Sequence, residues 1–80
     1  PALGTVESDA EARELTDGIN RFLAAQKKDD RYLFVRRYYF ADSVAELAAQ
    51  TGKSPHSVSV RLFRIREKLQ KYLRKEGLLP

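Results

Sequence analysis

The 80-residue chain contains no cysteine and only one histidine. Without cysteine it has neither disulfides nor thiolate metal ligands, and one histidine does not supply a metal cluster by itself. No stretch approaches the roughly 20 apolar residues that a membrane-spanning helix requires, and no segment has the pattern of a signal peptide. We therefore expect a cytoplasmic protein that uses no metal and no cofactor.

Charge is abundant but unevenly distributed. The hydrophobic content of 42% is enough for one compact core, and charged residues make up 32% of the chain. Residues 1–30 carry four basic and seven acidic side chains, whereas residues 53–80 carry eight basic and two acidic ones. The basic C-terminal third is consistent with two alternatives: an ordinary solvated face, or contact with a phosphate-rich partner.

The hydrophobic spacing and the capping signals predict an all-α protein of four helices. The sequence Ser43-Val44-Ala45-Glu46 is a capping box that begins the third helix, Gly52 ends it, and Ser54-Pro55 begins the fourth. Asp29 or Asp30 is expected to cap the second helix. The predicted segments are a flexible lead-in at 1–8, a helical domain at 9–77 with helices at about 9–26, 29–40, 44–50 and 55–75, and a tail at 78–80.

The second predicted helix is unusually aromatic. In so small a chain, aromatic side chains are most simply explained as core residues. This prediction applies to Tyr32, Phe34, Tyr38 and Tyr39. Base stacking of the kind seen in single-strand binding would instead require them on an exposed platform.

The two helices around Gly52 have the pattern of a helix-turn-helix. They are separated by a turn of about three residues, and Ala48 lies four residues before the glycine. A small side chain suits that position because the two helices cross closely there. Leu47 would then pack against Val58 and Leu62 of the second helix. Any helical hairpin with a tight turn imitates this pattern, so it is moderately specific.

Projection of the fourth helix at about 100° per residue separates three faces. The core face carries Val58, Leu62, Ile65, Leu69 and Tyr72. A basic flank carries Ser57, Arg61, Arg64, Lys68, Lys71 and Lys75. The outer face of the first turns carries His56, Ser59, Val60 and Phe63. An uncharged outer face beside a row of cations suits a helix that enters the major groove while the cations meet phosphates.

These residues resemble a known family. The runs Phe34-Val35-Arg36-Arg37-Tyr38, Ser43–Ala48 and, above all, Ser57–Leu69 are similar to the C-terminal, promoter-recognising domain of sigma-70-type RNA polymerase sigma factors, particularly those of the extracytoplasmic-function kind. The resemblance covers roughly residues 14–77. It implies a four-helix domain whose long last helix recognises the minus-thirty-five promoter element, while the first helices hold the flap of the polymerase β subunit.

The resemblance also implies roles for single residues. Arg37 would meet a phosphate, and Arg61 and Arg64 would lie near the DNA backbone. Base edges would be met by Ser57, Ser59, Val60 and Phe63. The candidate DNA-binding residues together are Arg37, Lys53, Ser54, His56, Ser57, Ser59, Val60, Arg61, Phe63, Arg64 and Lys68.

Polymerase binding is implied for Ile19, Phe22 and Leu23, which are either plain core residues or an exposed groove edge for the flap. The expected partners are double-stranded promoter DNA and the polymerase core, and an anti-sigma protein is a further candidate. The domain is expected to be a monomer without membrane contact. Both a stand-alone protein and a piece of a longer sigma factor fit this resemblance.

Two departures from the family pattern keep a second hypothesis open. Ser59 stands where the family often has a basic residue, and Val60 stands where serine is common. The alternative is a stand-alone helix-turn-helix adaptor that binds polymerase or a regulatory protein without reading DNA sequence. A response-regulator output domain ranks lower because that family lacks the run of arginines through Arg66. No acid pair or nucleophile–base arrangement is present, so the chain is not expected to be an enzyme.

Overall fold

The computed structural model describes the backbone of residues 6–79 and the side chains of residues 9–79. Four helices make up this part of the chain: α1 (Val6–Ala24), α2 (Lys28–Tyr38), α3 (Val44–Thr51) and α4 (Pro55–Lys75). The predicted all-α, four-helix fold is therefore confirmed. Residues 1–5 of the predicted lead-in, and Pro80 of the predicted tail, lie outside the described residues.

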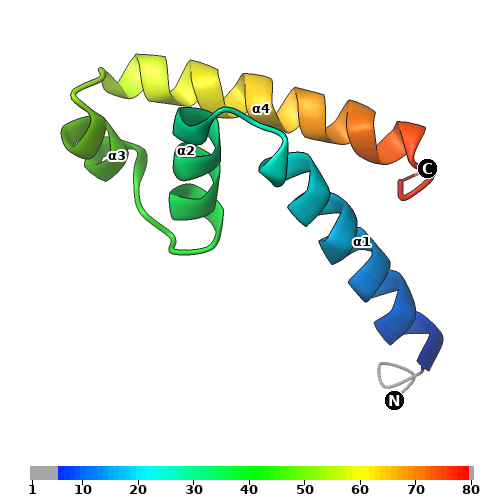
Figure 1. Cartoon of the computed structure of the whole chain (residues 1–80). Coiled ribbons are helices and arrows are strands. Elements are labelled where there is room, and N and C mark those ends of the chain that lie inside the picture. Colours follow the sequence, from blue (N-terminus) through cyan, green and yellow to red (C-terminus); the bar gives the residue numbers. More distant parts are fainter. Residues whose placement is uncertain (1–5, 80) are drawn as a thin grey trace.

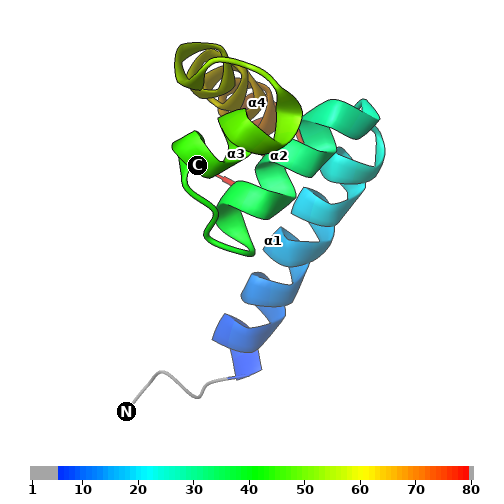
Figure 2. The same cartoon turned by 90° about the vertical axis from the view of Figure 1, so that its left-hand side faces the viewer.

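The longest helix, α4, runs across the top of Figure 1, and the other three helices lie beneath it in that view. α2 and α3 lie against its N-terminal half, and α1 contacts it farther along before diverging from it. Figure 2 shows α4 nearly end-on, with the other helices on one side of it. The opposite side of α4 is thus left uncovered by the other described helices.

The core consists of two clusters of buried side chains that share α4. The cluster at the helix-turn-helix contains Leu33, Leu47, Ala48, Val58 and Leu62. The second cluster joins α1 and α2 to the rest of α4 and contains Phe22, Leu23, Phe34, Ile65, Leu69 and Leu73. Four of the five residues of the predicted core stripe of α4 are buried, and Tyr72 is half-buried against the second cluster. Leu73 is buried in addition.

The termini of the first two helices differ from the prediction. α1 begins at Val6, inside the segment predicted as a lead-in. It ends at Ala24 because the next two N–H groups bond to carbonyls three residues back, which tightens the last turn. Neither Asp29 nor Asp30 caps α2: the N-cap is Lys27, without a side-chain hydrogen bond. Both aspartates lie in the first turn, where the helix dipole favours negative charge.

The prediction of an aromatic core in α2 is wrong for most of its members. Phe34 is buried, but a helix of 11 residues turns only a narrow face toward α3 and α4, and the other aromatic side chains lie outside that face. The side chains exposed by 43–60% are Tyr32, Tyr38, Tyr39 and Phe40. α2 ends at Tyr38, and Ala41 then takes a left-handed φ of 60° that turns the chain toward α3.

The residues after α4 fold back onto α1 instead of forming a free tail. Gly77 has a φ of 74°, its N–H donates to the Arg74 carbonyl at 3.0 Å, and the Leu78 N–H donates to the Leu73 carbonyl at 2.8 Å. This is a Schellman motif. Leu78 and Leu79 consequently pack, half-buried, against the second core cluster.

Candidate nucleic-acid interface

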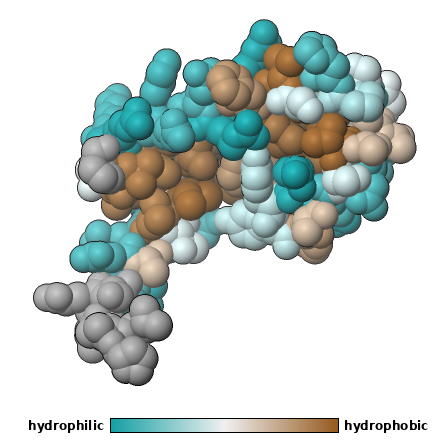
Figure 3. Space-filling model, turned by 180° about the vertical axis from the view of Figure 1, so that it is seen from behind, coloured by the Kyte–Doolittle hydropathy of each residue, from teal (hydrophilic) through white to brown (hydrophobic). Residues whose placement is uncertain are grey.

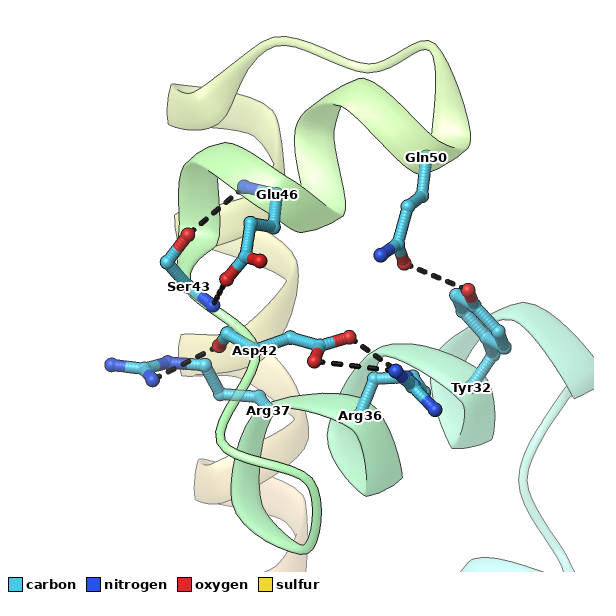
Figure 4. A network of polar contacts seen from close by, with 7 residues as sticks. All are labelled: Tyr32, Arg36, Arg37, Asp42, Ser43, Glu46 and Gln50. Carbon is cyan, nitrogen blue, oxygen red and sulfur yellow. Dashed lines mark hydrogen bonds and ion pairs between the residues drawn. The ribbon is translucent and has the colours of Figure 1, made fainter.

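Reciprocal hydrogen bonds hold the start of α3. The Ser43 hydroxyl accepts from the Glu46 N–H at 3.0 Å, and the Glu46 carboxylate accepts from the Ser43 N–H at 2.8 Å (Figure 4). This is the predicted capping box. Its two bonds satisfy backbone donors that the first turn of the helix leaves free.

The turn between α3 and α4 is built from local signals. Gly52 follows α3 in the left-handed conformation, with a φ of 73°. The Ser54 hydroxyl then accepts from the Ser57 N–H at 3.1 Å, and Pro55 is the first residue of α4. Proline loses nothing there because its missing N–H has no intrahelical partner at that position. α3, this turn and α4 form the predicted helix-turn-helix.

Polar contacts join α2 to α3 and to the connection between them (Figure 4). The Arg36 guanidinium donates to the Asp42 carboxylate at 2.7 and 3.3 Å. These hydrogen bonds raise the pKa of Arg36, so it remains a cation. Arg37 donates to the Asp42 carbonyl at 3.1 Å, and the Tyr32 hydroxyl donates to the Gln50 amide oxygen at 2.8 Å. Arg37 is half-buried, and its hydrogen bond holds its guanidinium beside the start of α3.

The outer face of the first turns of α4 is open to solvent. Val58 and Leu62 are buried below it, whereas Phe63 is 53% exposed. Val60 is half-buried, and the Arg66 guanidinium lies 5.9 Å from the centre of the Phe63 ring. Other predicted DNA-binding residues in this region are exposed (Ser54, His56, Ser59) or half-buried (Lys53, Ser57). The helix thus presents small, uncharged groups and one aromatic ring away from the core.

The basic flank of α4 is less uniform than its sequence indicates. Arg64 and Lys68 are exposed. Arg61 instead pairs with Asp30 of α2, and its Nη2 lies 2.7 Å from a carboxylate oxygen. The charge of Arg61 is therefore already balanced within the fold.

The surface predicted for polymerase also differs from the expectation. Phe22 and Leu23 are only 5% exposed, so the core alternative applies to them and they offer no groove edge. Ile19 is half-buried. Other half-buried apolar side chains that pack against the same core cluster include Leu15, Leu78 and Leu79. We call these four side chains the apolar surface; a hydrophobic area between α1 and the C-terminal end of α4 is visible in Figure 3.

Several residues of these surfaces escape prediction from sequence. Lys27 and Asp30 lie beside the basic flank of α4, although they lie outside the helix-turn-helix. Leu15 continues the helical spacing of Ile19, which is a usable signal. The sequence signal for Leu78 is weaker. A glycine before a pair of leucines indicates that α4 ends there, but it does not indicate where the chain runs afterwards.

No cluster of three or more metal-ligating side chains occurs in the part of the chain that the structure describes. None of the described helices combines the length and apolar character needed to span a membrane.

The two helices around Gly52, with the uncovered outer face of α4 beside its cations, place the chain in the class of helix-turn-helix proteins. Residues 21–69 match the family model described as Sigma-70, region 4. The chain therefore belongs to this family and is a DNA-binding, polymerase-docking domain of a sigma factor. The family is one of transcription-factor domains and is not catalytic. No curated protein and no solved structure gives a significant match to the chain.

Proposed function

We propose that this domain recognises the minus-thirty-five element of bacterial promoters through the first turns of α4. The observation that carries the proposal is the exposure of Phe63, 53%, on the outer face of a helix whose Val58 and Leu62 are buried. An apolar ring of this size gains little from facing water, whereas apolar side chains in the major groove contact thymine methyl groups. Ser59 adds a hydroxyl that donates to or accepts from base edges.

The cations beside this face supply affinity and orientation. Arg64 and Lys68 are exposed on the flank of α4, and Arg37 is held at the start of α3. Contacts with roughly 4–5 phosphates give a slope of about −4 when the logarithm of the binding constant is plotted against that of the salt concentration. Such contacts fix the position of α4 on the duplex but do not distinguish sequences.

The apolar surface is the proposed docking site for the flap of the polymerase β subunit. Ile19 is the only residue of the sequence-predicted set that reaches it, and Leu78 and Leu79 extend it from the other end of the chain. It lies on α1 and on the residues that follow α4, whereas the proposed DNA-binding face lies at the N-terminal end of α4 (Figure 1). Polymerase and DNA can therefore be held at the same time.

The test is a titration of labelled promoter duplexes by fluorescence anisotropy at several salt concentrations. Arg64→Ala is expected to weaken every duplex by about 1 kcal/mol and to make the salt slope less steep by about 1. Val60→Ser is expected to change the preference between duplexes by about 1 kcal/mol, because it alters a side chain at the base edges.

A binding constant that does not vary with salt would contradict the proposal. Identical effects of the two substitutions would refute the division into positioning and base-reading residues. Capture of the β flap without any duplex binding at low salt would favour the adaptor alternative, which rests on Ser59 and Val60 at positions where the family often has more polar residues.

A further inference from the structure

A basic cleft lies between the start of α2 and the flank of α4. Its volume is about 230 Å³, and it is lined by Lys27, Asp30, Arg61, Arg64, Ile65 and Lys68. Four of these six residues are cationic and one is anionic. The cleft is open to solvent on the same flank of α4 that the sequence marks as basic.

The single carboxylate of the cleft is already engaged. Asp30 Oδ1 accepts two hydrogen bonds from Arg61, at 3.0 Å from Nε and 2.7 Å from Nη2. The Asp30 side chain is 14% exposed and that of Arg61 is 36% exposed, so the pair lies in the wall of the cleft. Asp30 and Arg61 together contribute no net charge, and they brace α2 against α4.

The other three cations remain. Within the residues that the structure describes, Lys27, Arg64 and Lys68 form no ion pair, and all three are exposed. Like charges gathered around one cleft repel one another, and an anion placed among them relieves that repulsion. A phosphate fits this arrangement because it offers several acceptor oxygens to donors that approach from different directions.

The position of the cleft points to the source of the phosphate. Arg64 lies one turn from Val60 along the same side of α4, so the cleft borders the outer face that is proposed to enter the major groove. When a protein helix lies in the major groove, the DNA backbone at the edge of that groove passes beside the helix. Lys27 approaches the same cleft from the connection between α1 and α2, outside the helix-turn-helix.

We propose that this cleft binds one backbone phosphate of duplex DNA and that Lys27 is a phosphate contact alongside Arg64 and Lys68. The inference rests on the proposed function and extends its DNA contacts beyond the helix-turn-helix. Arg61 is a wall of this site, held by Asp30, rather than a direct contact.

The first experiment compares two neighbouring lysines in the whole chain. Lys27→Gln removes a cation of the cleft, whereas Lys28→Gln removes the same charge from an exposed lysine that lines a different cleft, with Tyr32 and Val35. Loss of one phosphate contact makes the salt slope less steep by about 1, so the advantage of the wild type over Lys27→Gln should shrink about fourfold between about 50 and about 200 mM salt. Lys28→Gln should follow the wild type.

The second experiment locates the phosphate. Duplexes are prepared with one phosphate at a time replaced by an uncharged methylphosphonate. At one backbone position the replacement is expected to weaken wild-type binding severalfold and to weaken the binding of Lys27→Gln clearly less, because one of the three cations around that phosphate is already missing. Circular dichroism of each variant verifies that the helices are intact.

The outcomes separate this inference from the proposed function. If the wild type shows no salt-dependent duplex binding, the proposed function fails and this inference fails with it. If the wild type binds and Lys27→Gln behaves like Lys28→Gln, or every methylphosphonate weakens Lys27→Gln as much as it weakens the wild type, only the inference about the cleft is overturned.

Discussion

Replacement of Gly18 by alanine is expected to bring no stabilisation, although Gly18 lies inside α1. In an ordinary helix interior this substitution stabilises by about 1 kcal/mol. Here the new Cβ would overlap the Cδ1 atom of Leu78 and would lie 3.3 Å from the Cδ2 atom of Leu73. The end of the Leu78 side chain must therefore move away from α1, which reduces its packing there.

The cost of that displacement offsets the gain in helix propensity. Full burial of a leucine side chain contributes about 1.5–3 kcal/mol, so displacement of the half-buried Leu78 costs about 1 kcal/mol. The net change for Gly18→Ala is then about 0 kcal/mol. In a Leu78→Ala background the overlapping atom is gone, Leu73 needs only a small shift, and the gain of about 1 kcal/mol should return.

The assay is urea unfolding followed by far-UV circular dichroism on the wild type, the two single variants and the double variant. The double-mutant cycle should show a coupling of about 1 kcal/mol between the two positions. An equal stabilisation by Gly18→Ala in both backgrounds would refute the reasoning, since it would mean that Leu78 does not pack on Gly18 in solution.

Two further predictions concern docking and the turn. Ile19→Ala should weaken binding of an isolated β-flap fragment about tenfold and leave duplex affinity unchanged. Asn20→Ala, at an exposed neighbouring position, should affect neither. Equal effects of both substitutions in a pull-down titration would exclude the apolar surface as the docking site. Gly52→Ala should lower the free energy of unfolding by about 1–2 kcal/mol, because a φ of 73° strains a residue with a Cβ even though no described atom lies within 4 Å of it; unchanged stability in urea unfolding would contradict this.

Much of the helix-turn-helix could be predicted from sequence because its signals are local. The capping box at Ser43, the left-handed turn at Gly52 and the cap at Ser54 each involve residues within one turn of one another. Their hydrogen bonds form wherever the chain is helical, so the pattern of residue types is sufficient.

The sequence did not predict which apolar side chains pack against other helices and which remain on the surface. Hydrophobic spacing shows that Phe22 and Ile19 lie on one face of α1, but Phe22 packs into the core of its own chain while Ile19 reaches the surface. The aromatic residues of α2 failed for the same reason. A helix buries only the face that its neighbours cover, and the crossing of α2 under α4 covers Phe34 while leaving Tyr39 exposed.

The amino-acid sequence alone determined the four helices, the turn at Gly52 and the division of α4 into a core face, a basic flank and an outer face, because helical spacing and capping act within a few residues. The tertiary structure alone decided that Asp30, 31 residues away, neutralises Arg61 and that Lys27 joins the basic flank. Contacts between distant residues depend on how helices cross, and the packing of the two core clusters sets that crossing.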